Sequence, residues 1–215
     1  MATSPSGTLM SVATVFGPAK TVTAITNAAE ASVSSTAHGF SVGDIVQIYS
    51  GWGRLNRRAA RIKTSTADAF VLEGINTVSP EYFPPGSGVG TVKKIITFQQ
   101  INKVLNPSSS GGEPKNITVK FLESDTEDSI SDGFSATTES FEIDADEFGG
   151  PAYTALVALT DVQSDTVIKK TLKSGSLIFT PGRIALNENV KLADGSIMTN
   201  AVSVNGNGKI TRYSA

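Results

Sequence analysis

The chain has 215 residues, of which 39% are hydrophobic, so it is long enough to bury one large core or two small ones. It contains no cysteine, which excludes disulfides and thiolate metal sites. No segment approaches the ~18 to 20 apolar residues of a membrane span, and the first residues lack the basic and apolar regions of a signal peptide. We therefore expect a soluble chain that is not exported and has no membrane partner.

The net charge of -2 conceals a strongly acidic block in the middle of the chain. Residues 113–147 carry eleven carboxylates and two lysines, whereas the sequence on either side is mildly basic. This separation of charge suits attraction between subunits, or repulsion of a polyanion, better than capture of a nucleic acid. With 20 glycines, 9 prolines and one tryptophan, the composition favours short strands and turns, and we predict a mainly β fold.

Two modules are predicted along the chain. Residues 1–19 form a Ser/Pro/Gly-rich arm that continues into a strand candidate at 9–16. Residues 20–92 alternate apolar and polar side chains in short runs joined by glycine-bearing turns, which predicts a small β module. A Pro/Gly-rich stretch at 80–90 marks its end, and residues 93–215 form the second module.

The second module opens with a strand candidate at 94–98, followed by a polar segment at 106–115. The Ser/Gly-rich composition of this segment predicts a long flexible loop outside the core. Strands are predicted at 117–122 and 140–145, and in the latter apolar and acidic side chains alternate, which indicates a sheet with one packed and one wet face. The acidic members of this pattern are Glu142, Asp144 and Asp146.

One helix and two hairpins complete the second module. Residues 151–160 begin with a proline at the first helical position and carry apolar side chains on one face, which predicts a short flanking helix. A hairpin is predicted from 166–172 to 177–180. A terminal hairpin is predicted from 201–204 to 209–213, because the Asn-Gly sequence between these strands favours the turns that match strand twist.

His38 is the one side chain of a type suited to proton transfer at neutral pH, because the chain has a single histidine. A triad of His38, Asp44 and a serine stays open, but the chain has no Gly-x-Ser-x-Gly elbow. His38 also lies in a turn-like segment, where hydrogen bonding to the backbone is the simpler explanation. We expect a non-enzymatic protein without catalytic residues.

Two further patterns suggest a ligand, and both have a simpler explanation. Four carboxylates at 125–132 suggest calcium, but they lack the ligand spacing of an EF-hand loop, and a solvated acidic loop explains them. The glycines at 86–90 lack the spacing and the following helix of a dinucleotide site, so this stretch is predicted to be a linker. We expect neither a metal nor a cofactor. The four carboxylates are Asp125, Glu127, Asp128 and Asp132.

Four arginines cluster beside Trp52, and they are Arg54, Arg57, Arg58 and Arg61. Basic groups next to a stacking aromatic suggest contact with phosphates. In a chain of balanced charge, however, arginines more often face carboxylates, and residues 113–147 of a neighbouring subunit supply them. We interpret the cluster as a candidate contact between subunits.

Several motifs of the first module stand out together. They are Thr21–Thr26, Ala37–Val46 with its His-Gly-Phe-Ser-Val-Gly-Asp run, Gly51-Trp52-Gly53, Leu55-Asn56 and Phe70–Leu72. These motifs resemble the small β-barrel module found in many phage structural proteins, although Arg57 stands where glycine commonly follows Leu-Asn. Across nearly the whole chain, the order of arm, inserted barrel, Ser/Gly loop, acidic strands, helix and last hairpin resembles the tail tube proteins of lambda-like siphophages.

This resemblance implies a β-sandwich with one short flanking helix and an inserted small β-barrel module on the outside. It implies a structural virion protein whose copies form hexameric rings, which stack into the tail tube through which DNA is ejected. Residues 1–10 and 106–115 would reach the adjoining ring. The candidates for this contact are Asn106, Ser108, Ser109, Ser110, Gly111, Gly112, Glu113 and Lys115.

The resemblance also implies partners and a location. The partners are further copies of the chain and the tape measure, tail terminator and distal tail proteins of the same phage. Assembly would take place in the host bacterial cytoplasm, and the product would lie in the virion tail.

DNA must slide through such a tube without sticking, which favours carboxylates on the lumen wall. We predict that Glu142, Asp144 and Asp146 face the lumen, while a position on the outer rim stays open, because alternation does not identify which wet face is meant. The alternative function is another tail component, such as a tail terminator, a minor tail protein or a carbohydrate-binding decoration protein.

Overall fold

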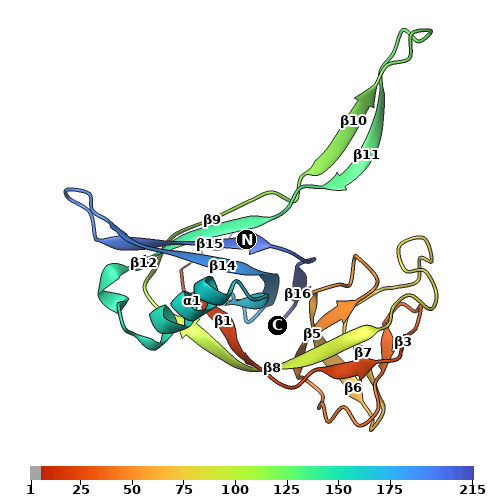
Figure 1. Ribbon diagram of the computed structural model, residues 1–215, viewed down its shortest axis with the longest axis horizontal. Helices are drawn as coiled ribbons and strands as arrows, with labels where there is room; N and C mark the ends of the chain where they lie inside the picture. The colour runs from red at the N-terminus through yellow and green to blue at the C-terminus, as the bar shows by residue number, and fades with distance from the viewer. Residues whose placement is uncertain (1–5) are drawn as a thin grey trace.

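The computed structural model describes residues 6–215, and residues 1–5 of the predicted arm lie outside that range. The fold is mainly β, as predicted, with one α-helix in the described part of the chain. Most strands belong to a single large antiparallel sheet, and two form a separate hairpin. Figure 1 shows three regions: a small barrel, a curled sheet beside the helix, and a hairpin that projects away from both.

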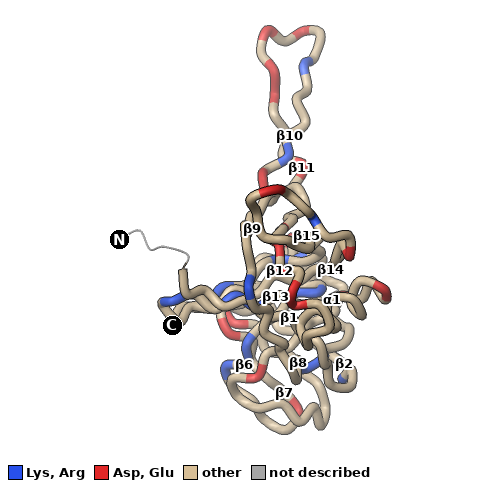
Figure 2. Tube along the Cα trace, turned by 90° about the vertical axis from the view of Figure 1, so that its left-hand side faces the viewer, with Lys and Arg blue, Asp and Glu red and all other residues tan. Residues whose placement is uncertain are grey.

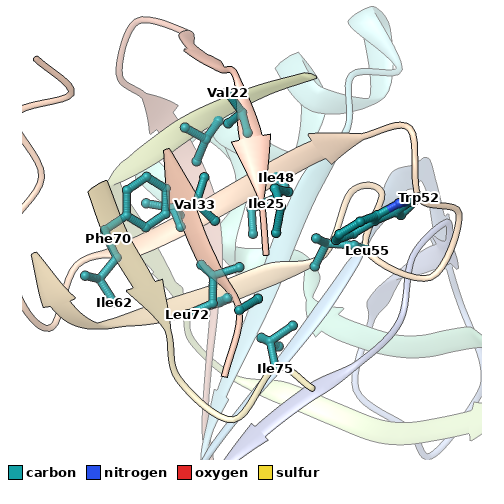
Figure 3. Close-up of a cluster of buried hydrophobic side chains, with 14 of the residues drawn as sticks. Val22, Ile25, Val33, Ile48, Trp52, Leu55, Ile62, Phe70, Leu72 and Ile75 are labelled. Atoms are coloured by element: carbon teal, nitrogen blue, oxygen red, sulfur yellow. The ribbon is translucent and has the colours of Figure 1, made fainter. Parts of the chain in front are cut away.

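The small barrel is formed by strands from the N-terminal part of the chain, which lie at one end of the strand order. Its strands are β2 (Lys20–Val22), β3 (Ala24–Ile25), β4 (Ser32–Ser34), β5 (Ile45–Ser50), β6 (Ala59–Ser65), β7 (Ala69–Leu72) and the start of β8 (Gly90–Ile101). Its core is a cluster of buried side chains that all lie between Val22 and Val92, drawn in Figure 3. Trp52 belongs to this core, and its indole Nε1 donates to the carbonyl of Pro84 at 2.8 Å.

The curled sheet contains the remaining long strands. They are β1 (Leu9–Phe16), β13 (Thr166–Thr171), β14 (Leu177–Lys191), β15 (Thr199–Gly206), β12 (Thr138–Asp144) and β9 (Val104–Ser110). Helix α1 (Pro151–Val162) packs on one face of this sheet. Leu156 of the helix is fully buried there against apolar residues such as Ile184 and Val202.

Strand β8 joins the two regions without a break. Its first half pairs with β5 as far as Lys94, and from Ile95 onward it pairs with β1. A third apolar cluster, which includes Ala59, Ile95 and Tyr213, fills the space where the barrel meets the sheet. The two regions therefore share a strand and a core, and the residue at which one module ends stays a prediction.

Two local predictions are confirmed. Strand β1 has the predicted bounds, and α1 begins at Pro151 and extends two residues beyond the predicted end. Gln163 ends the helix in a left-handed conformation with φ 51°, and its backbone N–H donates to the carbonyl of Leu159. No helix in the described part of the chain has the length and apolarity that a membrane crossing requires.

The prediction of a long loop at 106–115 is wrong. Strand β9 continues to Ser110 and β10 (Pro114–Val119) starts three residues later. The register between β9 and β12 shifts near Asn106, which has φ 47°. This bulge accommodates the following proline within an edge strand, so the polar sequence remains in the sheet.

The acidic segment predicted to be a loop contains a strand. Residues Asp128–Phe134 form β11, which pairs with β10 so that Ile117 faces Ile130. At its base, Gly111 has φ 82°, and a Cβ there would lie 2.0 Å from the carbonyl oxygen of Ala136. A glycine is therefore required where β9 ends and the hairpin begins.

The prediction of a terminal hairpin between 201–204 and 209–213 is also wrong. Strand β16 (Thr211–Tyr213) pairs with the start of β14, where Leu177 faces Tyr213. Strand β15 pairs further along the same strand, where Gly182 faces Gly206. The Asn-Gly sequence therefore interrupts two strands that run in one direction along β14, and it does not reverse the chain. Strand β14 itself passes through Pro181, whose carbonyl accepts from Asn207.

Candidate assembly surfaces

The β10–β11 hairpin projects from the body with apolar side chains in solvent. Figure 2 shows its red acidic positions at a distance from the rest of the chain, and residues 113–134 contain six carboxylates and two lysines. Its exposed apolar residues are Ile117, Phe121, Leu122, Ile130 and Phe134. Leu122, near the tip, is completely exposed. Exposed apolar groups that gather on one projecting element mark an interaction site.

The carboxylates that suggested calcium lie on this hairpin. Asp128 and Asp132 belong to β11, and Asp125 and Glu127 precede it. Within residues 6–215, no three or more histidine, cysteine, aspartate or glutamate side chains converge in a way that could hold a metal ion. The structure thus places these carboxylates on an exposed hairpin.

Two strand edges of the curled sheet are open in the described chain. Strand β9 is the last in the strand order, so no described strand lies beyond it. Residues 95–101 of β8 pair with β1 on one side, while β5 pairs only with the preceding part of β8. Such edges present backbone donors and acceptors that a strand of another copy can complete.

The predicted inter-ring residues divide between two places. Asn106, Ser108, Ser109 and Ser110 lie in β9, where Asn106 donates to Glu142 at 2.9 Å and the hydroxyls of Ser108 and Ser140 lie 2.7 Å apart. The others lie at the base of the hairpin, and they are Gly111, Gly112, Glu113 and Lys115. Their contact with another ring stays a prediction.

The wet face of β12 carries two of the three predicted lumen carboxylates. Phe141 and Ile143 are buried, whereas Glu142 and Asp144 are only partly covered, so the predicted alternation is present. Asp146 is different, because the strand ends at Asp144 and a 3₁₀ helix (Ala145–Glu147) follows. The predicted strand is confirmed over residues 140–144, and it ends one residue earlier than predicted, where Asp144 accepts from the N–H of Asp146 and caps this helix.

Lysines compensate these carboxylates. Lys191 Nζ lies 2.9 Å from Glu142, and Lys103 Nζ lies 3.4 Å from Asp144. Hydrogen bonds from Lys191 and Asn106 lower the pKa of Glu142. The pKa of Asp144 is lowered by the hydrogen bond from the backbone N–H of Asp146 and then by the charge of Lys103. Both carboxylates are therefore held ionised, but each has a basic partner within its own chain.

A shallow groove of about 610 Å³ lies on the same face. Its walls come from β9, β12, β14 and β15, and most of its residues have small or uncharged side chains. Ser140, Ala201 and Ser203 are examples. This face of the sheet is therefore wet, and its carboxylates Glu142 and Asp144 are compensated by lysines.

The four arginines have partners within their own chain. Arg54 lies over the ring of Tyr82 at 3.3 Å, and Arg58 Nε donates to the Thr211 hydroxyl at 2.9 Å. The other two bind carboxylates: Arg61 forms two hydrogen bonds with Glu73, and Arg57 Nε lies 2.8 Å from Asp165. Contact with a neighbouring subunit stays a prediction.

Sequence reasoning missed Asp165, Thr211 and Tyr213, which anchor the arginines. Tyr213 accepts from the backbone N–H of Arg61 at 2.8 Å, and its ring lies 4.6 Å from the Arg61 guanidinium. These partners lie more than a hundred residues away in sequence, as the separations of 108 and 153 for the Arg57 and Arg58 bonds show. No local pattern could have identified them.

His38 bonds to the backbone through Nδ1 while its Nε2 has no partner in the described chain, and Asp44 contacts the backbone and a lysine. His38 is buried, and its Nδ1 accepts from the N–H of Phe40 at 2.9 Å. Asp44 accepts from the N–H of Ser41 and lies 2.8 Å from Lys94 Nζ. Both side chains thus stabilise the turn before β5, which is the simpler of the two explanations considered from the sequence.

Open strand edges and a projecting apolar hairpin on a mainly β scaffold define a protein suited to self-association. The family model for the phage tail tube protein matches residues 50–215, which covers most of the curled sheet and part of the barrel. The chain therefore belongs to the phage tail tube protein family. Its role is structural, as a component of the virion tail that self-assembles and associates with other tail components. No curated protein matches the chain.

Proposed function

We propose that this chain is the tube subunit of a lambda-like siphophage, in which hexameric rings stack around a lumen through which the genome is ejected. The match to the tail tube family over residues 50–215 carries this proposal. The open edges of β8 and β9 support it, because a ring needs two complementary edges on each copy.

In the proposed ring, the outer edge of β9 pairs with the free part of β8 on the next copy. Both edges belong to the same curled sheet, so repeated pairing extends that sheet around an axis. Such head-to-tail contacts close when the rotation per copy divides a full turn. Pairing would also cover the exposed side of β9, whose residues from Asn106 to Ser110 are solvent-accessible in the single chain.

Contact between rings is assigned to the hairpin at 114–134 and to the predicted arm at 1–10, of which residues 9 and 10 already belong to β1. The predicted contact at 106–115 is kept only at the hairpin base, because residues 104–110 form an edge strand. The hairpin carries the exposed apolar groups that such a contact would bury.

The lumen wall in this proposal is the face of the curled sheet opposite α1. Glu142 and Asp144 lie on it, and Asp146 follows from the adjoining turn. Because Lys191 and Lys103 compensate the first two carboxylates, the wall would repel phosphates weakly and would offer them no unpaired cation at these positions. A map of the assembled tube with Glu142 and Asp144 on its exterior would remove this assignment.

The barrel at 20–92 is proposed to be an inserted module on the outside of the tube. Most of its core residues form a cluster of their own, and it is attached to the sheet through β8, the shared third cluster and the arginine contacts. The tape measure, tail terminator and distal tail proteins are the proposed partners, with assembly in the host bacterial cytoplasm.

Negative-stain electron microscopy of the purified protein at rising concentration tests the proposal. We expect hollow rods with regular cross-striations and six-fold end views. A chain that stays monomeric at high concentration, even in the presence of the tail initiator complex of its own phage, would contradict it.

A further inference from the structure

A groove of about 630 Å³ opens at the base of the hairpin, where the barrel and the curled sheet meet. Its apolar walls include Phe134, Ala136 and Ile210, and its volume is in the range of pockets that bind small ligands. Phe134, at the end of β11, is 71% exposed. The groove is therefore an apolar surface that the single chain leaves uncovered.

The rim of this groove is basic. Arg54 and Lys209 line it, and Arg58 lies close enough to act on Lys209. Partial burial, followed by the charges of Arg58 and Arg54, lowers the pKa of Lys209. An occupant that brings carboxylates would relieve this crowding of positive charge.

The tip of the hairpin has the complementary composition. Phe121 and Leu122 are exposed there, and Glu123, Asp125 and Glu127 follow directly. The tip therefore joins two large apolar side chains to a run of carboxylates, which matches an apolar groove with a basic rim.

The tip of one chain lies far from its own groove. The strand rises about 3.3 Å per residue, so Val119 at the end of β10 lies about 17 Å along the hairpin from Pro114 at its base, and Leu122 follows it. Figure 1 shows that the hairpin extends away from the body and does not fold back. The hairpin tip of a chain therefore does not reach its own groove, and a tip seated there would belong to another copy.

We propose that the groove receives the hairpin tip of a second copy of this chain, with Phe121 and Leu122 against Phe134 and Ile210 and the carboxylates at the rim. This inference rests on the proposed tube function and specifies where one ring engages the next. Each copy offers one tip and one groove at different places, so the contact is head-to-tail and repeats along the tube axis.

Disulfide cross-linking tests the contact, because the natural chain has no cysteine. The double variant Leu122→Cys/Ala136→Cys should give a ladder of covalent oligomers when its tubes are oxidised, since a disulfide forms only when the Cα atoms approach within about 7 Å. The matched control is Leu122→Cys/Val162→Cys, whose second cysteine lies at the exposed end of α1. We expect at least a tenfold lower yield of dimer from the control.

A charge exchange provides a second test. Arg54→Glu/Lys209→Glu should raise the concentration needed for tube formation at least tenfold, and adding Glu123→Lys/Asp125→Lys should restore most of the loss. If the wild type forms tubes but the oxidised Leu122→Cys/Ala136→Cys variant gives no cross-linked oligomers, the groove contact is overturned and the tube function is left intact. Absence of tubes from the wild type even with its initiator complex would overturn both.

Discussion

Arg57 Nε of the barrel lies 2.8 Å from Oδ2 of Asp165, the residue directly before β13 of the curled sheet. The other oxygen of Asp165 accepts from Arg183 Nε at 2.9 Å and from Asn207 Nδ2 at 2.7 Å. Only 12% of the Asp165 side chain is exposed. One carboxylate therefore connects the barrel, β14 and the segment between β15 and β16.

Replacement of Asp165 by Asn should destabilise the protein. The substitution leaves Arg57 and Arg183 without a counter-charge, and removal of one member of such a partly buried network costs about 1–3 kcal/mol. Urea denaturation measures the free energy of unfolding. The control is Asp161→Asn, because Asp161 is an exposed carboxylate at the end of α1. Equal stability of the two variants would contradict the connecting role of Asp165.

Acid should weaken the same connection. Burial alone would raise the pKa of Asp165, but hydrogen bonds and charge from Arg183 and Arg57 outweigh it and hold the pKa below its ordinary value. The contribution is therefore fully present above the unfolded-state pKa, which is about 3.9, and is lost as the pH falls through the lower folded-state pKa. Between pH 6 and pH 3, the wild type should lose more stability than Asp165→Asn. Parallel losses in the two proteins would count against this assignment.

Replacement of Tyr213 by Phe should loosen the C-terminal strand from the barrel. The Tyr213 hydroxyl accepts from the backbone N–H of Arg61 at 2.8 Å and donates to the carbonyl of Glu73 at 3.3 Å, and the side chain is buried. Loss of these bonds should cost about 1 kcal/mol. Thermal denaturation measures the change, and Tyr82→Phe is the control because that ring is 43% exposed. An unchanged melting temperature for Tyr213→Phe would refute the prediction.

Removal of the hairpin should abolish assembly without unfolding the body. The backbones of Glu113 and Ser135 lie side by side, since Ser135 N–H donates to Glu113 at 2.9 Å, so an Asn-Gly turn can replace residues 114–134. No core residue is lost, and we expect a change in unfolding free energy of at most about 0.5 kcal/mol. Light scattering at high concentration measures assembly. Normal tubes from this variant would show that the hairpin is dispensable.

Replacement of Leu156 by Ala should destabilise the curled sheet. Leu156 is fully buried between α1 and the sheet, and such truncations cost about 2–5 kcal/mol. Denaturation followed by circular dichroism measures the loss. Val162→Ala is the control, because that side chain is 74% exposed at the end of the same helix. If the two variants are equally stable, the helix does not pack on the sheet as described.

Local sequence signals identified several elements with accuracy. Strand β1 and helix α1 were recognisable because an apolar run ended by Gly-Pro, and a proline after two glycines, act within a few residues of the element they define. The alternation in β12 also revealed which side chains are buried, because each strand residue points to the opposite face from the one before it.

Pairing between distant strands was not readable in the same way. The Asn-Gly sequence at the end of β15 suggested a hairpin, yet β16 pairs with β14, and Gly208 passes so close to Pro181 that a Cβ would lie 2.9 Å from its ring. The Ser-rich segment of β9 suggested a loop, yet its backbone bonds to β12 hold it in the sheet. Such tertiary contacts outweigh local propensity. Strands pair through backbone groups that nearly all residues share, so the local sequence does not identify the partner strand.

The sequence by itself thus determined the mainly β class, the positions of β1 and α1, and the acidic block. Only the tertiary structure decided that the acidic block forms a projecting hairpin, that Arg57 meets Asp165 within one chain, and that β8 and β9 keep open edges. The physical reason is the separation along the sequence over which each interaction acts. Side-chain periodicity and turn residues act over a few positions, whereas ion pairs and strand edges depend on segments that only folding brings together.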